Sequence, residues 1–407
     1  MVKQGRVNLI LLSCLLLASG CHRAPEAPFP SWLESSVPGS NSTGSFASYE
    51  KAADLAEKSA PSLVRRVSFT PGMKEDAIRL LKPSIALIQQ AVRHPSAFAF
   101  KPTLPNEVAE HQRGWRLIGR TLTWRIEKAI AEGRTDDAAS DTVLAVRFGL
   151  ELSGGSATDA SLGLTTVNEA LQAVGPGLQL MSATSLKRLA LGLDKALRAR
   201  PSLVQSISHE RLSMLAAVQW VQDSYRSGDF EAISRTIGPD SREAVTFLKE
   251  MKPKDSSLRP AYFRGFANEA ETMVNWLRQC SQLPASARPK RPSEPSNAWR
   301  PWKRFAKHFF WTAEPLLSLD DLAVARIRLG ILQAVVRSRI LATHSAPDSL
   351  AGYPKRWTLD PYSGKPFVYR AEGPDYDLYS VGPNLQDDAG DSNETGLQPD
   401  LVFWQGD

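Results

Sequence analysis

The chain has 407 residues, of which 42% are hydrophobic and 23% are charged, and its formal net charge is +6. This composition is ordinary for a globular protein and excludes a disordered, collagen-like, disulfide-rich or multi-spanning membrane chain. At roughly 100 to 200 residues per domain, the length predicts two or three domains. The charge is unevenly placed, because nine acidic residues and neither Lys nor Arg follow Arg370.

Residues 1–20 have the layout of a secretory signal, with two basic residues, an apolar run at 7–17 and then small residues. The eleven residues of that run span about 17 Å as a helix, which is too short for a hydrocarbon core of about 30 Å. The segment LLLASGC, ending at Cys21, resembles the lipobox of bacterial lipoproteins, although Ala18 stands where that family usually has Leu. The resemblance implies that Cys21 is lipidated and becomes the mature N-terminus. The alternative is a plain signal peptide that ends near a Cys.

Residues 21–48 are rich in Pro, Ser and Gly, and they predict a flexible tether between the lipid and the folded part. Because His22 rather than Asp follows Cys21, resemblance to bacterial lipoprotein sorting implies the periplasmic face of the outer membrane. Cys14 leaves with the signal, so Cys280 remains as the one cysteine without lipid and no intramolecular disulfide is expected. We expect Cys280 to be a small buried hydrophobe, with a reactive thiol as the alternative.

Residues 49–315 predict an irregular α-helical domain, arranged like an array of helical hairpins. The clearest helix follows Ser182, where apolar residues spaced by three and four positions form one stripe that ends before Pro201. A second stripe at 117–130 stops at Gly133, and a third helix stops at Gly154. Further helical windows are Asp76–His94, Val204–Arg226, Ser241–Met251, Ala261–Leu283, Trp299–Trp311 and Leu319–Thr343. Residues 114–152 weakly resemble a tetratricopeptide hairpin, but no second copy follows at that family's period of about 34 residues.

Enzyme signatures are absent from the sequence, which has no GxGxxG, GxxxxGK[ST], GxSxG or HExxH motif. His209 and Glu210 begin a helix-like HERLSM, but Ser213 stands where a zinc protease has its second His. The basic and aromatic segment 288–307 is expected to be a loop followed by a helix that packs on the core, with contact to a membrane or partner as the alternative. The tryptophans at apolar helical positions, Trp115, Trp124, Trp220 and Trp276, are expected in the core.

Residues 316–407 predict a helix followed by a small β-region with three short strands. Turn residues become dense after Tyr353, and the strand candidates are Pro366–Arg370, Tyr376–Val381 and Leu401–Trp404. The fold class is therefore mainly α, with a small α+β module at the C-terminal end.

Three motifs in this module, DPYSGKPFVYR, YDLYSVG and DLVFW, resemble in order and spacing the C-terminal domain of the major pseudopilin of bacterial type II secretion. That family binds calcium in the loop after its second strand. The resemblance implies a site formed by Val381, Asn384, Gln386 and Asp400, with Asp387, Asp388 and Asp391 in a longer loop. Closely spaced acids on a turn-rich loop suit Ca²⁺ independently, since the ion takes six to eight oxygen ligands. The alternative is a solvated acidic loop.

The pseudopilin family assembles fibres through an N-terminal hydrophobic helix, whereas the single apolar run of this chain is the lipoprotein-like signal. We therefore expect a lipid-anchored bacterial cell-envelope protein of structural or protein-interaction type, with Ca²⁺ as a candidate ligand and no enzymatic activity. Its partners are expected to be the membrane and an unidentified envelope protein, and not nucleic acid. The alternative is an accessory component of a type II secretion or pilus-like apparatus, and the third hypothesis is an envelope hydrolase.

Overall fold

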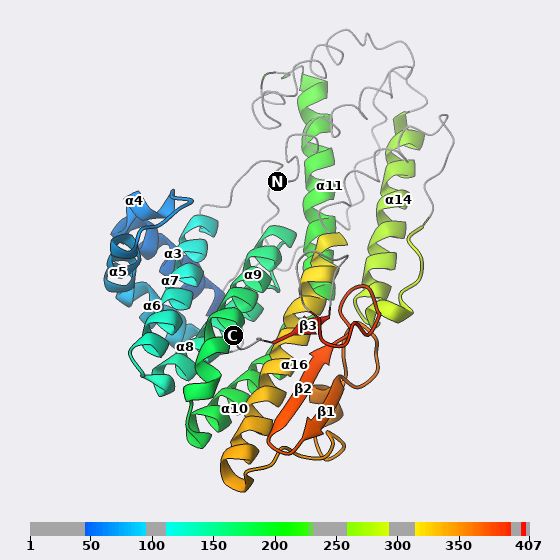
Figure 1. Cartoon of the computed structure of the whole chain (residues 1–407). Coiled ribbons are helices and arrows are strands. Elements are labelled where there is room, and N and C mark those ends of the chain that lie inside the picture. Colours follow the sequence, from blue (N-terminus) through cyan, green and yellow to red (C-terminus); the bar gives the residue numbers. More distant parts are fainter. Residues whose placement is uncertain are drawn as a thin grey trace.

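The computed structural model describes residues 45–94, 111–227, 229, 231, 259–292, 314–391 and 400–403. It is mainly helical with a three-stranded antiparallel sheet near the C-terminus, which confirms the predicted fold class (Figure 1). The signal at 1–20, Cys21 and the predicted helices at 241–251 and 299–311 lie outside the described residues. Within the described part, no helix is both long and apolar enough to cross a membrane.

The helical part has the following elements in chain order. They are α3 Ser45–Ser59, α4 Pro61–Val64, α5 Pro71–Leu80, α6 Lys82–Ala91, α7 Gln112–Ala131, α8 Thr135–Leu152, α9 Ala157–Val174, η1 Gly175–Leu180, α10 Ala183–Ala199, α11 Leu203–Ser227, α14 Arg259–Cys280, η3 Ala285–Ala287, α16 Glu314–Thr343 and α17 Lys355–Thr358. Helix α3 begins within the range expected for the tether. The predicted helix Asp76–His94 is in fact two helices that meet at Leu81, because Pro83 starts a new helix there.

Helices α7, α8 and α9 form the centre of the body, with α3 and α6 on one side and α10 and α16 on the other (Figure 1). The axes of α8 and α9 approach closely at Gly149 and Gly163. A Cβ atom on either glycine would collide with the backbone carbonyl of the other, so only glycine permits this helix crossing.

Helix α10 shows how the sequence pattern produces the packing. The Ser182 side chain accepts a hydrogen bond from the backbone N–H of Ser185 at 3.1 Å and caps the helix. The predicted stripe faces inward, with Leu186, Leu189 and Leu193 fully buried, and each such leucine contributes about 2 kcal/mol by leaving water. The helix ends at Ala199, two residues before Pro201, as predicted.

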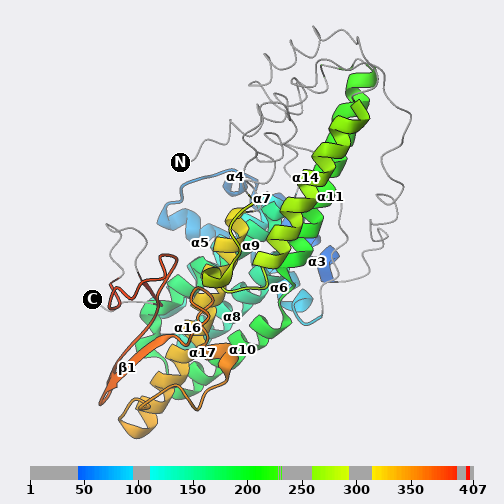
Figure 2. The same cartoon turned by 90° about the vertical axis from the view of Figure 1, so that its right-hand side faces the viewer.

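Helices α11 and α14 run antiparallel and project from the body as a pair (Figure 2). The base of the pair contains an ion pair between Arg211 and Glu271 and a hydrogen bond of 3.0 Å from Arg278 Nη2 to Ser208 Oγ. Cys280 at the end of α14 is buried, as expected for a small core residue.

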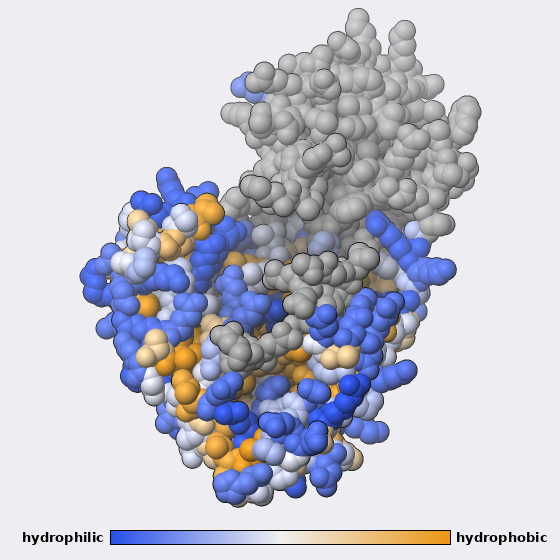
Figure 3. Space-filling view, in the orientation of Figure 1, coloured by the Kyte–Doolittle hydropathy of each residue, from blue (hydrophilic) through white to orange (hydrophobic). Residues whose placement is uncertain are grey.

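The C-terminal cap consists of α17 and the strands β1 Val368–Glu372, β2 Asp375–Ser380 and β3 Leu401–Val402, in the sheet order β1-β2-β3. The sheet packs on α16, where Phe403 lies against Gly330 and leaves no room for a side chain there. One hydrophobic cluster joins the helical body, α16 and the inner residues of the cap. Figure 3 shows that hydrophilic residues cover much of one face, with apolar residues exposed toward its lower end.

Candidate cation site in the C-terminal cap

The loop that leaves β2, residues 381–391, is tightly wound. Four of its residues adopt positive φ angles, namely Gly382 at 61°, Leu385 at 62°, Ala389 at 60° and Gly390 at 81°. Non-glycine residues seldom adopt this conformation, because their Cβ atom crowds the backbone. These four left-handed residues make the backbone change direction repeatedly within eleven residues.

The first two sequence motifs of the cap meet at Asp360, which is buried. Its carboxylate accepts hydrogen bonds from the Tyr362 backbone N–H at 3.0 Å and from the Ser380 hydroxyl at 2.8 Å. Ser380 Oγ in turn accepts the N–H of Gly382 at 3.1 Å. The Asp-Pro turn therefore fixes both the end of β2 and the start of the acidic loop.

Asp387 is held by groups from both long strands of the cap. Its carboxylate accepts hydrogen bonds from the Tyr379 hydroxyl at 2.8 Å, the Ala389 N–H at 3.1 Å and the Arg370 guanidinium at 3.3 Å. The hydrogen bonds from Tyr379 and Ala389 lower the pKa of Asp387, and the charge of Arg370 adds to this effect. Burial and the adjacent carboxylate raise the pKa of Tyr379 to about 12. Asp387 is therefore an anion at neutral pH.

Asn384 and Asp388 close the middle of the loop. Asn384 Nδ2 donates to Asp388 Oδ2 at 2.7 Å, and Asn384 Oδ1 accepts the N–H of Gln386 at 3.0 Å. An Asx turn of this kind orders the backbone without any metal. The amide oxygen of Asn384 would have to exchange this N–H partner in order to bind a cation.

Asp400, just before β3, lies beneath the loop and is only 2% exposed. Its Oδ2 accepts the N–H of Gly390 at 2.8 Å, while its Oδ1 has no hydrogen-bond partner among the described residues. Burial raises the pKa of Asp400, the amides of Gly390 and Asp388 oppose that rise, and the charges of Asp388 and Asp387 reinforce it. An orphaned carboxylate oxygen in a buried position is costly unless a positive or hydrogen-bonding group completes it.

In the structure, Asp387 and Asp388 lie near enough to Asp400 for their charges to act on its carboxyl group. Asp391 is exposed at the end of the loop, where its N–H donates to the Asp388 carbonyl at 3.1 Å. Val381 begins the loop and Gln386 lies in its middle, and each has a backbone carbonyl. No set of three or more His, Cys, Asp or Glu side chains in the described ranges is already arranged around a metal position. Cation binding here would therefore also need backbone or amide oxygens.

The sequence analysis did not identify Asp360 or Tyr379 as residues that shape the site. Asp360 belongs to a quoted motif, DPYSGK, in which an Asp followed by a Pro and a Gly is a turn signal. The interaction of Tyr379 with Asp387 carries no local signal, because it depends on how the loop folds back across β2.

A second group of buried acids belongs to the first turns of α16 and bears on the hydrolase hypothesis. Arg200 pairs with Asp320 at 2.6 Å, and Arg288 pairs with both oxygens of Asp321 at 2.6 and 2.7 Å. Burial raises the pKa of Asp321 to about 6, although Arg288 opposes the rise. Each carboxylate is engaged by an arginine, an arrangement typical of a structural ion-pair network.

The tryptophans and His209, which the sequence analysis singled out, pack within the protein where the structure describes their side chains. Trp115 and Trp124 are buried, Trp276 is half-buried with its Nε1 donating to the Pro289 carbonyl at 3.1 Å, and the side chain of Trp220 lies outside the described residues. His209 is buried, and its Nδ1 lies 3.2 Å from the Gly155 carbonyl. Burial lowers the pKa of His209, so its imidazole is neutral at pH 7. Most of the basic segment 288–307 lies outside the described residues.

No protein-family model matches the chain, and neither does any curated protein or solved structure. The resemblances of the Cys21 segment to a lipobox and of the cap to a pseudopilin therefore stay predictions from the sequence.

Proposed function

We propose that the chain is a lipid-anchored bacterial cell-envelope protein of structural or protein-interaction type, in which a C-terminal cap binds Ca²⁺. The lipobox-like segment at Cys21 supports the anchor, and the absence of catalytic signatures from the sequence supports a non-enzymatic role. The outer-membrane location follows from the same sequence pattern.

The observation that carries the calcium proposal is the buried carboxylate of Asp400, whose Oδ1 has no hydrogen-bond partner in the described part of the chain. Two further acids, Asp387 and Asp388, lie close enough to raise its pKa by their charge. In the absence of a cation these three carboxylates repel one another in a partly dehydrated setting. A divalent cation would relieve that repulsion and complete the coordination of Asp400.

The donor set of the loop fits a hard cation. Carboxylates, an amide and backbone carbonyls are the oxygen ligands that Ca²⁺ prefers, and the loop has no thiol or imidazole that would favour a softer metal. Asp387, Asp388 and Asp400 would hold the ion, with Asn384, Asp391 and the carbonyls of Val381 and Gln386 as the other candidate ligands. Bound Ca²⁺ would close the loop between β2 and β3 and stiffen the cap.

The second candidate function is an accessory of a type II secretion or pilus-like apparatus. Strand β1 lies at one edge of the sheet and pairs with β2 alone among the described strands. An edge strand of this kind can pair with a strand of a partner. An envelope hydrolase ranks behind both, because an arginine engages each member of the buried acidic pair Asp320 and Asp321.

Metabolic labelling with an azido-fatty acid tests the anchor. We expect the full chain to be labelled in a bacterial host and Cys21→Ser to lose the label. Labelling that survives in Cys21→Ser would refute lipidation at this residue.

Co-purification separates the two candidate functions. Enrichment of pseudopilins with the full chain, relative to a chain that lacks residues 353–407, would support the secretion accessory. Equal recovery with both chains would remove it.

A further inference from the structure

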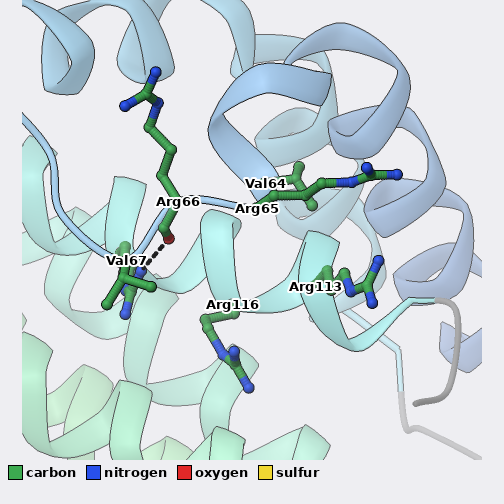
Figure 4. Close-up of a pocket in the computed structure, with 7 residues that line it drawn as sticks. Val64, Arg65, Arg66, Val67, Arg113 and Arg116 are labelled. Atoms are coloured by element: carbon green, nitrogen blue, oxygen red, sulfur yellow. Dashed lines mark hydrogen bonds between the residues drawn. The ribbon is translucent and has the colours of Figure 1, made fainter. Parts of the chain in front are cut away.

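A groove on the helical body is lined mainly by arginines. It lies between the residues that follow α4 and the outer face of α7, has a volume of about 610 Å³, and is bordered by Arg65, Arg66, Arg113, Arg116 and Arg120 (Figure 4). The three residues on α7 are spaced by three and four positions and therefore share one face of that helix. We call this feature the arginine groove.

The charge of the arginine groove is largely uncompensated. Within the part of the chain that the structure describes, Arg65, Arg66, Arg113 and Arg116 form no ion pair with an acid. Farther along the same helix, Arg125 pairs with Asp141 at 2.9 Å. Like charges spaced by three or four positions destabilise a helix, so a cluster of this kind is unfavourable unless it meets an anion.

Two acids lie near the arginine groove, and each is already engaged. Glu57 Oε1 accepts the backbone N–H of Gly114 at 3.2 Å, and Glu169 lies close enough to Arg120 for that charge to act on its pKa. Arg120 also donates to the Arg66 carbonyl at 3.4 Å and lies over the Phe69 ring at 5.5 Å. Neither acid forms an ion pair with Arg65, Arg66, Arg113 or Arg116 in the described part of the chain, so the groove stays positive.

The side chains around the groove are arranged for an extended anionic surface. In Figure 4 the side chain of Arg66 points upward, that of Arg116 downward, and those of Arg65 and Arg113 to the right, so the four do not converge around one small ion. Val67, at the edge of the groove, is 89% exposed and places an apolar side chain beside the cations. Basic residues together with an exposed apolar residue are typical of a protein surface that lies on anionic lipid headgroups.

The position of the arginine groove relative to the predicted anchor supports this occupant. Helix α3, the first described element, begins 24 residues after Cys21 and packs along α7. At that contact Trp115 Nε1 donates to the Tyr49 carbonyl at 2.8 Å. The predicted tether therefore leads into α3, which packs directly on α7, the helix that carries three of the arginines.

We propose that the arginine groove rests on an anionic phospholipid surface and so provides a second, electrostatic contact beside the predicted lipid anchor. The proposal rests on the anchored state proposed above, since a tether of this length keeps the groove near the bilayer. A lipid chain together with a basic patch holds a protein at a membrane more firmly than either does alone.

Vesicle titration tests the arginine groove separately from the anchor, because every chain carries Cys21→Ser and so has no acyl group. Binding is measured by co-sedimentation with vesicles of phosphatidylcholine alone and with vesicles that also contain phosphatidylglycerol. The double variant Arg113→Gln/Arg116→Gln is compared with Lys187→Gln/Lys195→Gln, which removes two exposed cations from α10. Circular dichroism melting checks that all of the chains are folded.

We expect the anionic vesicles to bind the parent chain more tightly than the neutral vesicles do. The Arg113→Gln/Arg116→Gln chain should bind the anionic vesicles about 25-fold more weakly, or about fivefold per arginine, which corresponds to about 1 kcal/mol each. The α10 variant should change binding less than twofold. Raising the salt to about 0.5 M should abolish the anionic preference. If the Arg113→Gln/Arg116→Gln chain does not fold, Arg65→Gln/Arg66→Gln, in the residues that follow α4, tests the same groove.

Three results would overturn the proposal. The first is equal binding to anionic and neutral vesicles, and the second is an equal loss in the α10 variant and the groove variants. The third is full competition by millimolar inorganic phosphate at constant ionic strength, which would assign a small soluble anion to the groove. None of these results depends on whether Cys21 is lipidated, which the fatty-acid labelling decides.

Discussion

Replacing Asp194 by Ala would remove the main polar link between the helical body and the C-terminal cap. Asp194 lies on α10 and is 3% exposed. Its carboxylate accepts hydrogen bonds from the Trp357 indole N–H at 2.7 Å and from Arg356 Nε and Nη2 at 2.8 and 3.3 Å, and it pairs with Arg198 at 3.1 Å. The variant would leave a half-buried indole N–H and two arginines without this partner.

The expected loss follows from the exposure of each donor. An unsatisfied N–H at a largely buried position costs about 1–3 kcal/mol. The side chains of Arg356 and Arg198 are 48% and 61% exposed to water, so their ion pairs with Asp194 add little to the loss. The unsatisfied indole N–H therefore dominates, and we expect Asp194→Ala to lower the free energy of unfolding by about 1–3 kcal/mol.

Urea unfolding of the full chain measures this loss, and Asp76→Ala is the matched control. Asp76 pairs with Arg79 at 2.7 Å, but both side chains are more than half exposed, so its removal should cost less than about 0.5 kcal/mol. Hydrogen exchange should also show lower protection of β1 and β2 in Asp194→Ala than in the control. Equal unfolding midpoints and equal exchange for the two variants would refute the role of Asp194 in holding the cap.

The same carboxylate predicts a pH dependence. Burial alone would raise the pKa of Asp194, but the hydrogen bonds from Arg356 and Trp357 and the charges of Arg356 and Arg198 outweigh it, and the net effect lowers the pKa. The contribution of Asp194 is therefore present above its unfolded pKa of about 3.9 and is lost as the pH falls through the lower folded value. The free energy of unfolding should fall less steeply with decreasing pH in Asp194→Ala than in the wild type. An equally steep fall in both would contradict this role of Asp194.

The remaining predictions concern the buried acid pair and the helix crossing. Because burial raises the pKa of Asp321 to about 6, the native state binds the additional proton and the stability of the wild type should fall as the pH rises from about 4 to 6. Asp321→Asn should remove that decline, which amounts to about 2–3 kcal/mol. Urea unfolding at several pH values measures it, and a decline that persists in Asp321→Asn would contradict the prediction. Gly163→Ala should lower the melting temperature, since its Cβ would collide with the Gly149 carbonyl and overpacking of this kind costs about 1–3 kcal/mol. Gly72 has open space around it, so the control Gly72→Ala should leave the melting temperature equal or slightly higher. Equal calorimetric melting temperatures for Gly163→Ala and Gly72→Ala would count against a tight α8–α9 crossing.

The sequence predicts the helices that keep one face in water. Helix α10 and helix α7 each have a clear apolar stripe, and both are found within a few residues of the predicted positions. Helix α9 was not among the predicted windows, because small and polar residues such as Gly163, Thr166 and Asn168 are buried together with its apolar ones. A helix that is enclosed on most sides loses the periodic signal on which the prediction depends.

The acidic site is predictable only in part. The three motifs of the cap predict its strands, and the structure has all three with shifted ends. The approach of Asp400 to Asp388 was expected only through the resemblance, since no periodic pattern relates residues on either side of a loop. The contact between Asp194 and Trp357 joins residues 163 positions apart and has no local signal at all.

Calcium titration of the full chain tests the proposed role of the cap most directly. Calorimetric melting with millimolar Ca²⁺ should raise the melting temperature of the wild type, because a ligand at about 100 times its Kd stabilises the native state by about 2.7 kcal/mol. The exposed-acid control Asp377→Ala should keep the shift, and Asp400→Ala should lose it. An unchanged melting curve of the wild type, or a full shift in Asp400→Ala, would contradict a calcium site in the cap.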